Sequence, residues 1–500
     1  MTEIAKRKYK PILIILLCSL VLIIIMQPWN LYFLNDDFEH IPAIGQTLVI
    51  RKNFLRPFAN LFLLFDNCLY GKWAPGYFLT TWLLHSATSV SIYYASRDVI
   101  RKYIPYLPSR TALLTSLFFL FYPFHAEPLF WIIGRGSIIA ALFTILSIYF
   151  YLKKDEKNTY LLISLLLFTV ALLSYESIWN AIFFYCLISF LNIKQHAANH
   201  KRERFHSGIF VLTFIAYFIV RYYTLNTLTG DYAQIDNNIF NFRLLLTNII
   251  KLTGRNFTPP FLNAVFSLIF FSLSVIIYTV AIAVMLKKNT KAGWLMIILW
   301  LGVISGVITA APLGIDTHGN ESERYIYYSS FFFCFFLAIA TTLPKRKEWQ
   351  YIINGFIITL AIAGLITYNV NYRYASAVTK TTLQFVKKYP DFKNAYFIDV
   401  PEEYKGALIF RTSLPDAIYW VDTECKYDSI KIISKTENAR GKLPYETGEK
   451  TWEELSRAKG FKIGKNIYGV KDTLNRNVTL NKNDILFWFN GKGIFKVNRP

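Results

Sequence analysis

The sequence predicts a polytopic α-helical membrane protein with about eleven transmembrane helices, followed by a C-terminal soluble domain of mixed α/β structure. Three observations lead to this fold class. The 500 residues are 54% hydrophobic, with a mean hydropathy of +0.32, whereas soluble chains are about 45–50% apolar. Uninterrupted apolar runs such as 11–26 and 264–286 are long enough to cross a bilayer. After residue 372 these runs end and short strand-like segments begin.

The apolar spans are each roughly the length that a bilayer requires, with a few shorter ones that need flanking residues. The first follows a basic start and is followed by Gln27, Pro28 and Trp29, not by a small-residue cleavage site, which predicts an uncleaved signal anchor. The predicted spans are 11–27, 76–96, 111–124, 136–152, 160–174, 177–193, 208–226, 262–286, 293–311, 326–343 and 350–371.

The formal charge of +22 is concentrated in alternate loops between these spans. Cytoplasmic loops carry the excess of Lys and Arg, so the basic loops predict a cytoplasmic N-terminus and an outer C-terminal domain. Bilayer orientation therefore explains the charge, and nucleic acid is not expected as a partner. The five cysteines show neither disulfide nor zinc spacing. The basic loops are 1–10, 97–110, 153–157, 194–204, 287–291 and 345–347, and the outer ones 28–75, 124–135, 174–177, 227–261 and 312–325.

Residues 372–500 form the second predicted domain, and residues 1–371 the first. We expect strands at 395–400, 407–410, 417–421, 429–434 and 484–489, and helices at 376–388 and 451–458. Within the outer loops, the apolar residues of 56–71 recur at helical spacing and predict a helix along the membrane surface. The run 244–250 predicts an interfacial or partly re-entrant segment.

Ionisable residues outside the basic loops gather after four odd-numbered spans, and therefore on the outer side. This arrangement suits a reaction at the membrane–water boundary, whereas a transporter tends to place such groups near the bilayer midplane. The residues are Asp36, Asp37, Glu39, His40 and Arg56; His125, Glu127 and Arg135; Glu176; and Asp316, His318, Glu321, Glu323 and Arg324.

Several short motifs lie in a fixed order along residues 30–345. They are NDD at 35–37, RP at 56–57 leading to LYG at 69–71, YFLTTWLLH at 77–85, YPFHAEPLFWIIGR at 122–135, ALLSYES at 171–177 and ERYIYYSS at 323–330. In order and spacing they resemble GT-C glycosyltransferases, in particular the membrane part of the tetratricopeptide-linked protein O-mannosyltransferases and their bacterial relatives. The chain departs from that family after the last span, where no tetratricopeptide repeats follow.

The resemblance implies a membrane enzyme that moves a sugar, with inversion, from a polyprenyl-phosphate carrier to an acceptor protein, lipid or glycan. An acceptor hydroxyl needs a base, which we expect to be Asp36 or Asp37, with Asp37 favoured. Glu127 is expected to be a second acid that orients the acceptor or helps to hold a metal. Arginine binds phosphate through two parallel hydrogen bonds. The carrier phosphate is therefore assigned to Arg56, Arg135 and Arg324, with His125 as a helper, and Glu39, Glu176 and Glu323 complete the site.

Each of these residues also has a purely structural interpretation. Asp36 and Asp37 are suited to capping a helix after the first span. Glu127 and Arg135 are close enough in sequence to pair, and Arg324 has Glu321 and Glu323 beside it. Alternative roles remain for other residues too: Glu176 as a cap of its turn, His85 as a buried histidine with satisfied hydrogen bonds, and Arg221 as an interfacial side chain. No ligand spacing indicates a metal, although an oxygen-rich loop allows a divalent cation.

Two other functions compete with the monosaccharide transferase. A transporter or flippase for a lipid-linked sugar would move the lipid without changing its glycan. A glycan polymerase or ligase would use a carrier that bears an oligosaccharide. The membrane is expected to be a bacterial inner membrane, and the C-terminal domain is expected to bind the acceptor or shield the site.

Overall fold

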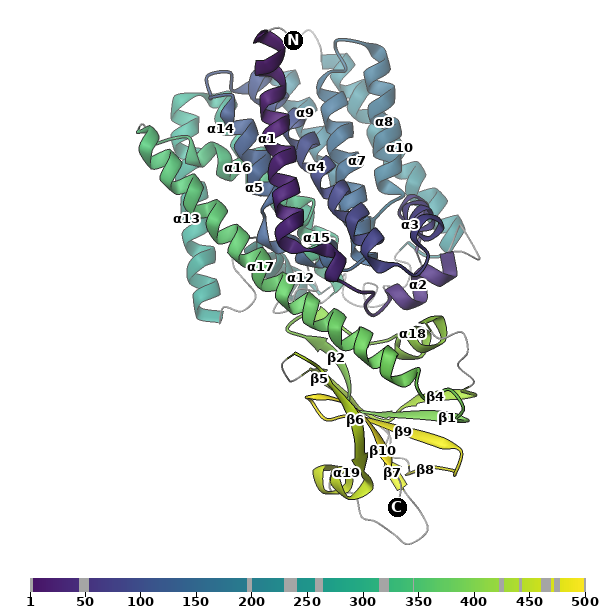
Figure 1. Ribbon diagram of the computed structural model, residues 1–500. Coiled ribbons are helices and arrows are strands. Elements are labelled where there is room, and N and C mark those ends of the chain that lie inside the picture. Colours follow the sequence, from purple (N-terminus) through teal and green to yellow (C-terminus); the bar gives the residue numbers. More distant parts are fainter. Residues whose placement is uncertain are drawn as a thin grey trace.

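The computed structural model describes residues 3–44, 54–195, 200–228, 241–256, 264–313, 323–344, 346–421, 427–439, 443–459, 469–471 and 477–498. A bundle of helices forms one part of the molecule, and a smaller domain that contains the strands of the described residues forms the other (Figure 1). The chain begins at the far end of the bundle and ends at the far end of the smaller domain.

The long helices fall on the apolar ranges predicted from the sequence. Their bounds are α1 Glu3–Met26, α4 Ala74–Tyr103, α5 Arg110–Leu120, α7 Gly136–Leu152, α8 Asn158–Leu172, α9 Ala181–Gln195, α10 His200–Leu225, α13 Ala264–Lys288, α14 Thr290–Ile308, α16 Ser329–Thr341 and α17 Lys347–Val386.

Among the described residues, seven helices are long and apolar enough to cross a membrane, or eight if a bent pair counts as one span. The bent pair joins α5 to residues Pro123–Phe130 at an angle of 55°, because Pro123 cannot continue the helix. Helices α8 and α16 are apolar but shorter. Helix α4 is less apolar because it buries hydroxyl residues and His85 in the bundle. The chain is thus a multi-pass membrane protein, and eleven crossings stay a prediction.

Short helices build the end of the bundle that lies nearest the smaller domain. They are α2 Asp37–Ile44, α3 Pro57–Tyr70, α6 Ala126–Phe130, α12 Phe242–Arg255 and α15 Glu323–Ile326, with the 3-10 turns η1 Pro28–Asn30, η2 Pro123–His125, η3 Ile133–Arg135, η4 Glu176–Ile178 and η6 Ala311–Leu313. Helix α3 confirms the helix predicted over 56–71, and α12 contains the apolar run 244–250.

Three basic loops meet at the opposite end of the bundle. Asp155 lies within 4 Å of both Lys102, at 3.8 Å, and Lys154, at 3.9 Å, and it also pairs with Arg202. Lys154 pairs with Glu203 at 3.0 Å. The loops that follow the second, fourth and sixth spans therefore share one side, as charge alternation predicts. That this side is cytoplasmic stays a prediction.

The smaller domain contains a mixed five-stranded sheet with the strand order β4-β1-β9-β10-β6. Strand β1 runs parallel to both β4 and β9, and β10 is antiparallel to β9 and parallel to β6. A second sheet has the order β3-β2-β5, and β7 pairs with β8. The bounds are β1 Asn394–Ile398, β2 Val400–Tyr404, β3 Ala407–Leu408, β4 Ser429–Ile432, β5 Lys435–Asn438, β6 Glu446–Thr451, β7 Gly469–Lys471, β8 Asn477–Thr479, β9 Asp484–Phe489 and β10 Gly493–Asn498, with helix α19 Trp452–Lys459 after β6.

The strand predicted at 417–421 is wrong, because these residues belong to helix α18, Leu414–Val421. Leu414, Ala417 and Ile418 are buried, and positions i, i+3 and i+4 share one helix face. Pro415 in the first turn and Ser413 before the helix are typical helix-start residues. The other predicted strands and the helix at 451–458 coincide with observed elements.

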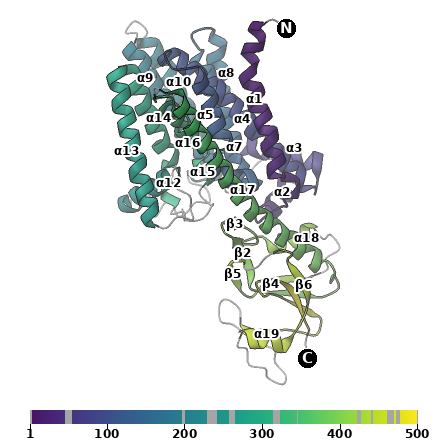
Figure 2. The ribbon, with the colours of Figure 1, turned by 60° about the vertical axis from the view of Figure 1, so that its left-hand side comes forward.

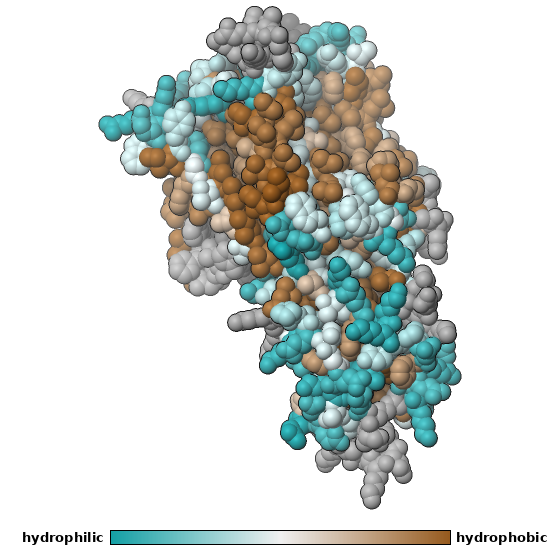
Figure 3. All heavy atoms as spheres, viewed as in Figure 1, coloured by the Kyte–Doolittle hydropathy of each residue, from teal (hydrophilic) through white to brown (hydrophobic). Residues whose placement is uncertain are grey.

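Helix α17 joins the two parts without a break (Figure 2). The predicted boundary at 371/372 falls within this helix, where the residues NYRYAS contain no Pro or Gly to end it. The surface of the bundle is mainly apolar along α1 and its neighbours, and the surface of the smaller domain is mainly hydrophilic (Figure 3).

Helix α18 packs against residues 33–39 of the bundle, which contain Asp36, Asp37 and Glu39 and are called the acidic segment. The ring of Trp420 lies 4.9 Å from Phe33 and 5.9 Å from Phe38, measured between centroids. The backbone N–H of Asn35 donates to the carbonyl of Ile409 over 3.0 Å. Residues that lie almost 400 positions apart thus meet at one surface.

Candidate functional site

The acidic segment after the first span forms a tight turn that leads into α2. Asn35 adopts a left-handed backbone with φ of 44°, a conformation that Asn tolerates better than most residues. The turn separates two adjacent acids into different surroundings. Asp37 is fully buried, Asp36 is half-buried and Glu39 is exposed.

Asp37 uses both carboxylate oxygens to hold the backbone in place. One accepts the N–H of Leu34 over 2.9 Å, and the other accepts the N–H of Ile133 over 3.1 Å. Burial raises the pKa of Asp37 to about 8, although these two hydrogen bonds oppose the shift. The side chain therefore ties the acidic segment to η3, and its geometry is that of a structural clamp.

Asp36 faces the smaller domain. Its Oδ1 accepts the hydroxyl of Thr412 over 2.6 Å and the side-chain amide of Asn35 over 2.7 Å. Thr412 also donates its backbone N–H to Asn35 Oδ1 over 3.0 Å. A hydroxyl group thus already donates a hydrogen bond to this carboxylate, which is the geometry that a general base needs toward an acceptor hydroxyl.

A cationic pocket lies on the other side of this turn. It offers about 30 Å³ of free space, enough for about two water molecules, between His40, Arg56, Asn60, Ile133 and Tyr175. His40 Nδ1 lies 2.9 Å from the backbone oxygen of Asp36, the residue directly before α2, so the pocket and the acid meet at the N-terminal end of this helix.

Arg56 is held rigidly in that pocket. Its guanidinium lies over the rings of Phe54 and Tyr175, at 4.3 and 4.2 Å, and it pairs with Glu176 at 2.7 Å. Glu176 also pairs with Arg221 at 3.1 Å. Two guanidinium groups thus meet at one carboxylate, and clustered positive charge favours an anion nearby.

Two more ion pairs lie where helix α6 meets helix α15. Both oxygens of Glu127 are engaged by Arg324, one by its guanidinium and the other by its backbone N–H over 2.9 Å. Glu323 pairs with Arg255 at 2.7 Å and accepts the N–H of Glu127 over 3.0 Å. The four charges cancel pairwise, and Glu323 and Arg255 are almost completely buried.

Aromatic and backbone contacts connect these clusters. The rings of Tyr175 and Tyr325 are tilted against each other with centroids 6.2 Å apart, and the guanidinium of Arg324 lies over the ring of Trp131 at 5.3 Å. Together with the Ile133–Asp37 hydrogen bond, these contacts bring together the segments around Asp36, Glu127, Glu176 and Glu323. Helix α2, which follows Asp36, and helix α15, which contains Glu323, lie in the half of the bundle that is nearer the smaller domain (Figure 1).

Two of the expected phosphate ligands are buried in the bundle and contact other protein groups. Arg135 is 1% exposed and pairs with the buried Asp66, so Asp66 and not Glu127 is its partner. His125 is fully buried among Phe119, Tyr122 and Tyr327 and lies 2.7 Å from the hydroxyl of Ser330.

The structure also tests the structural interpretations of other residues. His85 is a buried histidine between the hydroxyl of Tyr327 and the carbonyl of Leu120, as expected. The interfacial placement of Arg221 is wrong, because this side chain is buried and bound to Glu176. Asp316, His318 and Glu321 lie outside the described residues.

Three residues at this end of the molecule are not apparent from the sequence as site residues: Asp66, Arg255 and Thr412. Asp66 interrupts an apolar helix, and that interruption is the signal that points to a buried partner. For Thr412 the sequence carries no such signal. Among the described residues, no group of three or more His, Cys, Asp or Glu side chains is placed to hold a metal ion, and the divalent cation stays a prediction.

Comparisons with known proteins found solved structures that are similar to this chain. No family model matches the chain, and no curated protein sequence matches it. The archaeal oligosaccharyltransferase AglB from Archaeoglobus fulgidus, in complex with an inhibitory peptide and a dolichol-phosphate, is similar with a TM-score of 0.50 and 12% identity, over 85% of this chain and 64% of that chain. The chain thus spans less than two thirds of the oligosaccharyltransferase.

Two further solved structures are similar at lower scores. The Archaeoglobus fulgidus oligosaccharyltransferase tethered to an acceptor peptide with the NVT sequon gives a TM-score of 0.49 at 12% identity, over 86% of this chain and 64% of that chain. ArnT from Cupriavidus metallidurans bound to undecaprenyl phosphate gives 0.45 at 10% identity, over 86% and 87%. The likeness to AglB, at a TM-score of 0.50, shows the fold alone: the chain has a GT-C-like membrane fold.

Proposed function

We propose that the chain is an inverting membrane glycosyltransferase that moves a sugar from a polyprenyl-phosphate carrier to an acceptor hydroxyl. The observation that carries the proposal is the meeting of Asp36, which already accepts a hydroxyl hydrogen bond, with the cationic pocket around Arg56. The AglB structure of the same fold holds a dolichol-phosphate, and we extend a polyprenyl phosphate ligand to this chain.

In the proposed reaction the carboxylate of Asp36 takes the proton of the acceptor hydroxyl. The acceptor oxygen forms a bond to the anomeric carbon of the sugar from one face, and the bond from that carbon to the phosphate oxygen breaks on the opposite face. The polyprenyl phosphate leaves with the bonding electrons, so the anomeric configuration inverts. The guanidinium groups of Arg56 and Arg221, which meet at Glu176, support stabilisation of the phosphate as its charge develops.

The remaining residues receive supporting roles in this proposal. Asp37 fixes the turn that presents Asp36, and Glu127 holds Arg324 at the rim of the site. Arg135 with Asp66 and His125 with its aromatic neighbours maintain the packing of the bundle. We also propose that the end of the bundle nearest the smaller domain faces outward, and that the basic loops at the opposite end lie in the cytoplasm.

Reconstituted proteoliposomes containing lipid extracts with polyprenyl-phosphate sugars test the function. We expect sugar transfer by the wild-type protein, and by Asp428→Asn as a matched control, because it makes the same chemical change as Asp36→Asn at a side chain of the smaller domain that is 64% exposed. Asp36→Asn should lower the transfer rate by about 10²- to 10⁴-fold. Movement of a labelled lipid across the bilayer without change of its glycan would instead indicate a flippase, and transfer of whole oligosaccharides would indicate a polymerase or ligase.

A further inference from the structure

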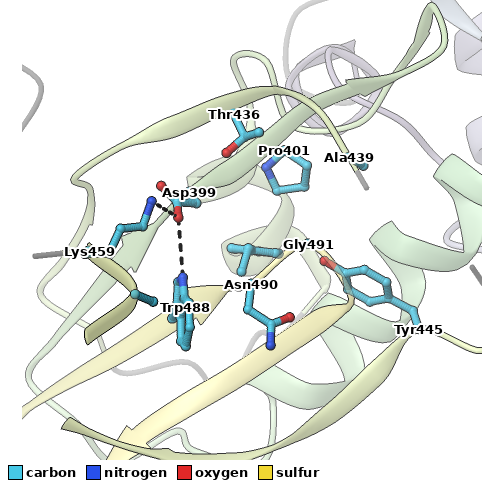
Figure 4. A pocket seen from close by; sticks show the side chains of 11 residues that line it. Asp399, Pro401, Thr436, Ala439, Tyr445, Lys459, Trp488, Asn490 and Gly491 are labelled. Atoms are coloured by element: carbon cyan, nitrogen blue, oxygen red, sulfur yellow. Dashed lines mark hydrogen bonds and ion pairs between the residues drawn. The ribbon is translucent and has the colours of Figure 1, made fainter. Parts of the chain in front are cut away.

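The smaller domain contains a cavity that the proposed reaction does not use. Its volume is about 360 Å³, within the range of small-ligand sites. Strands β2, β5 and β9 and helix α19 supply its walls through Pro401, Thr436, Trp488 and Lys459. Figure 4 shows these side chains around the open space.

Three polar groups line the cavity without a protein partner among the described residues. They are the hydroxyls of Tyr445 and Thr436 and the amide nitrogen of Asn490. The Asn490 oxygen is occupied, because it accepts the backbone N–H groups of Lys492 and Gly493 over 3.0 and 3.1 Å. Its nitrogen therefore keeps a fixed orientation and its donor capacity.

The charges at the cavity are balanced. Asp399 pairs with Lys459 and accepts the indole N–H of Trp488 over 3.3 Å. Its other oxygen accepts the hydroxyl of Ser434 over 2.9 Å, and its backbone is left-handed, with φ of 57°. Such a strained conformation in a non-glycine residue occurs preferentially at ligand sites.

The balanced charge of the cavity favours a neutral ligand. Its three polar groups without a protein partner favour a ligand that is rich in hydroxyls, and the indole and phenol rings favour one with apolar faces. We propose that this cavity binds a neutral saccharide of one or two sugar units. The role of that saccharide as part of the acceptor or product glycan rests on the proposed transferase function, whereas binding itself does not.

Binding is tested on the full chain in detergent, without any lipid-linked donor. The probes are glucose, galactose, mannose, N-acetylglucosamine and their disaccharides, with saturation-transfer NMR to detect contact and calorimetry to measure affinity. We expect at least one probe to bind at millimolar concentration. Tyr445→Phe should weaken binding about 5- to 10-fold, because it removes one hydrogen-bonding hydroxyl.

Two more variants make the test specific. Asn490→Asp keeps the acceptor oxygen of the turn but replaces the donor nitrogen, and it should weaken binding by a similar factor. Tyr419→Phe makes the same chemical change as Tyr445→Phe at a half-exposed position outside the cavity and should leave affinity unchanged. If no probe binds, or if neither cavity variant changes affinity, the inference is wrong.

Asp36→Asn separates this inference from the proposed function. It should lose sugar transfer and keep saccharide binding. Transfer by the wild-type protein without saccharide binding would refute the cavity proposal alone. Saccharide binding without transfer by the wild-type protein would refute the transferase alone.

Discussion

Replacing Asp36 or Asp37 by asparagine should give two different phenotypes, although the residues are adjacent. The Asp36 carboxylate is half-buried and accepts hydrogen bonds from the side-chain amide of Asn35 and the hydroxyl of Thr412. The amide oxygen of an asparagine at this position can accept both. Asp36→Asn should therefore change the free energy of unfolding by no more than about 0.5 kcal/mol. Loss of a general base should lower the transfer rate by about 10²- to 10⁴-fold.

Asp37→Asn has a structural cost instead. Asn offers one acceptor oxygen where Asp37 uses two against the backbone N–H groups of Leu34 and Ile133. One buried N–H would then face an amide NH₂ group, at a cost of about 1–3 kcal/mol. We expect a clear fall in melting temperature and a smaller, indirect loss of transfer.

Both variants are measured beside the control Asp428→Asn by labelled-sugar transfer in proteoliposomes and by thermal unfolding in detergent. Full activity of Asp36→Asn would refute its role as the base. If Asp37→Asn loses 10²-fold or more of the activity while its melting temperature stays unchanged, Asp37 is the base and the clamp interpretation is wrong.

Three further perturbations test the surroundings of the site. Arg135→Ala leaves Asp66 buried without its cation and should cost about 3–5 kcal/mol of unfolding free energy; an unchanged melting temperature would contradict the pair. Thr412→Val removes the hydroxyl that orients Asp36 and should reduce transfer about 10-fold or more at unchanged stability, whereas faster transfer would mean that Thr412 competes with the acceptor. Because burial raises the pKa of Asp37 to about 8 in the folded state, protonation favours folding; this stabilisation is complete below about pH 4 and is lost as the pH rises to about 8. The fall in melting temperature from pH 5 to pH 8 should accordingly be smaller in Asp37→Asn than in the wild-type protein, and equal slopes would refute the buried titration.

Much of the bundle could be predicted because its signals are local. A run of apolar residues long enough for a bilayer specifies a helix wherever it occurs, and Pro123 marks the bend of its own span. Charge alternation likewise predicts which loops share an end, and the ion pairs of Asp155 with Lys102 and Arg202 agree with it. Length and loop charge need no knowledge of which helix packs on which.

The partners of the charged residues could not be predicted in the same way. Glu127 and Arg135 lie eight positions apart in sequence, yet they pair with Arg324 and Asp66, on separate helices. A buried charge takes whichever opposite charge the packing brings within reach, and that choice depends on contacts between distant segments. The error at 417–421 is of another kind, since the helix-start residues of α18 were readable in the sequence.

By itself, the sequence determined that this is a multi-pass membrane protein, and it predicted that the acids and arginines gather after odd-numbered spans. Hydrophobic length and loop charge act on each segment separately, so they can be read without a fold. Only the tertiary structure decided that Asp37 is buried and accepts the backbone N–H of Ile133, while Asp36 accepts the hydroxyl of Thr412 from the smaller domain. Burial and hydrogen bonding distinguish two identical neighbouring side chains, and both are set by segments almost 100 and almost 400 residues away.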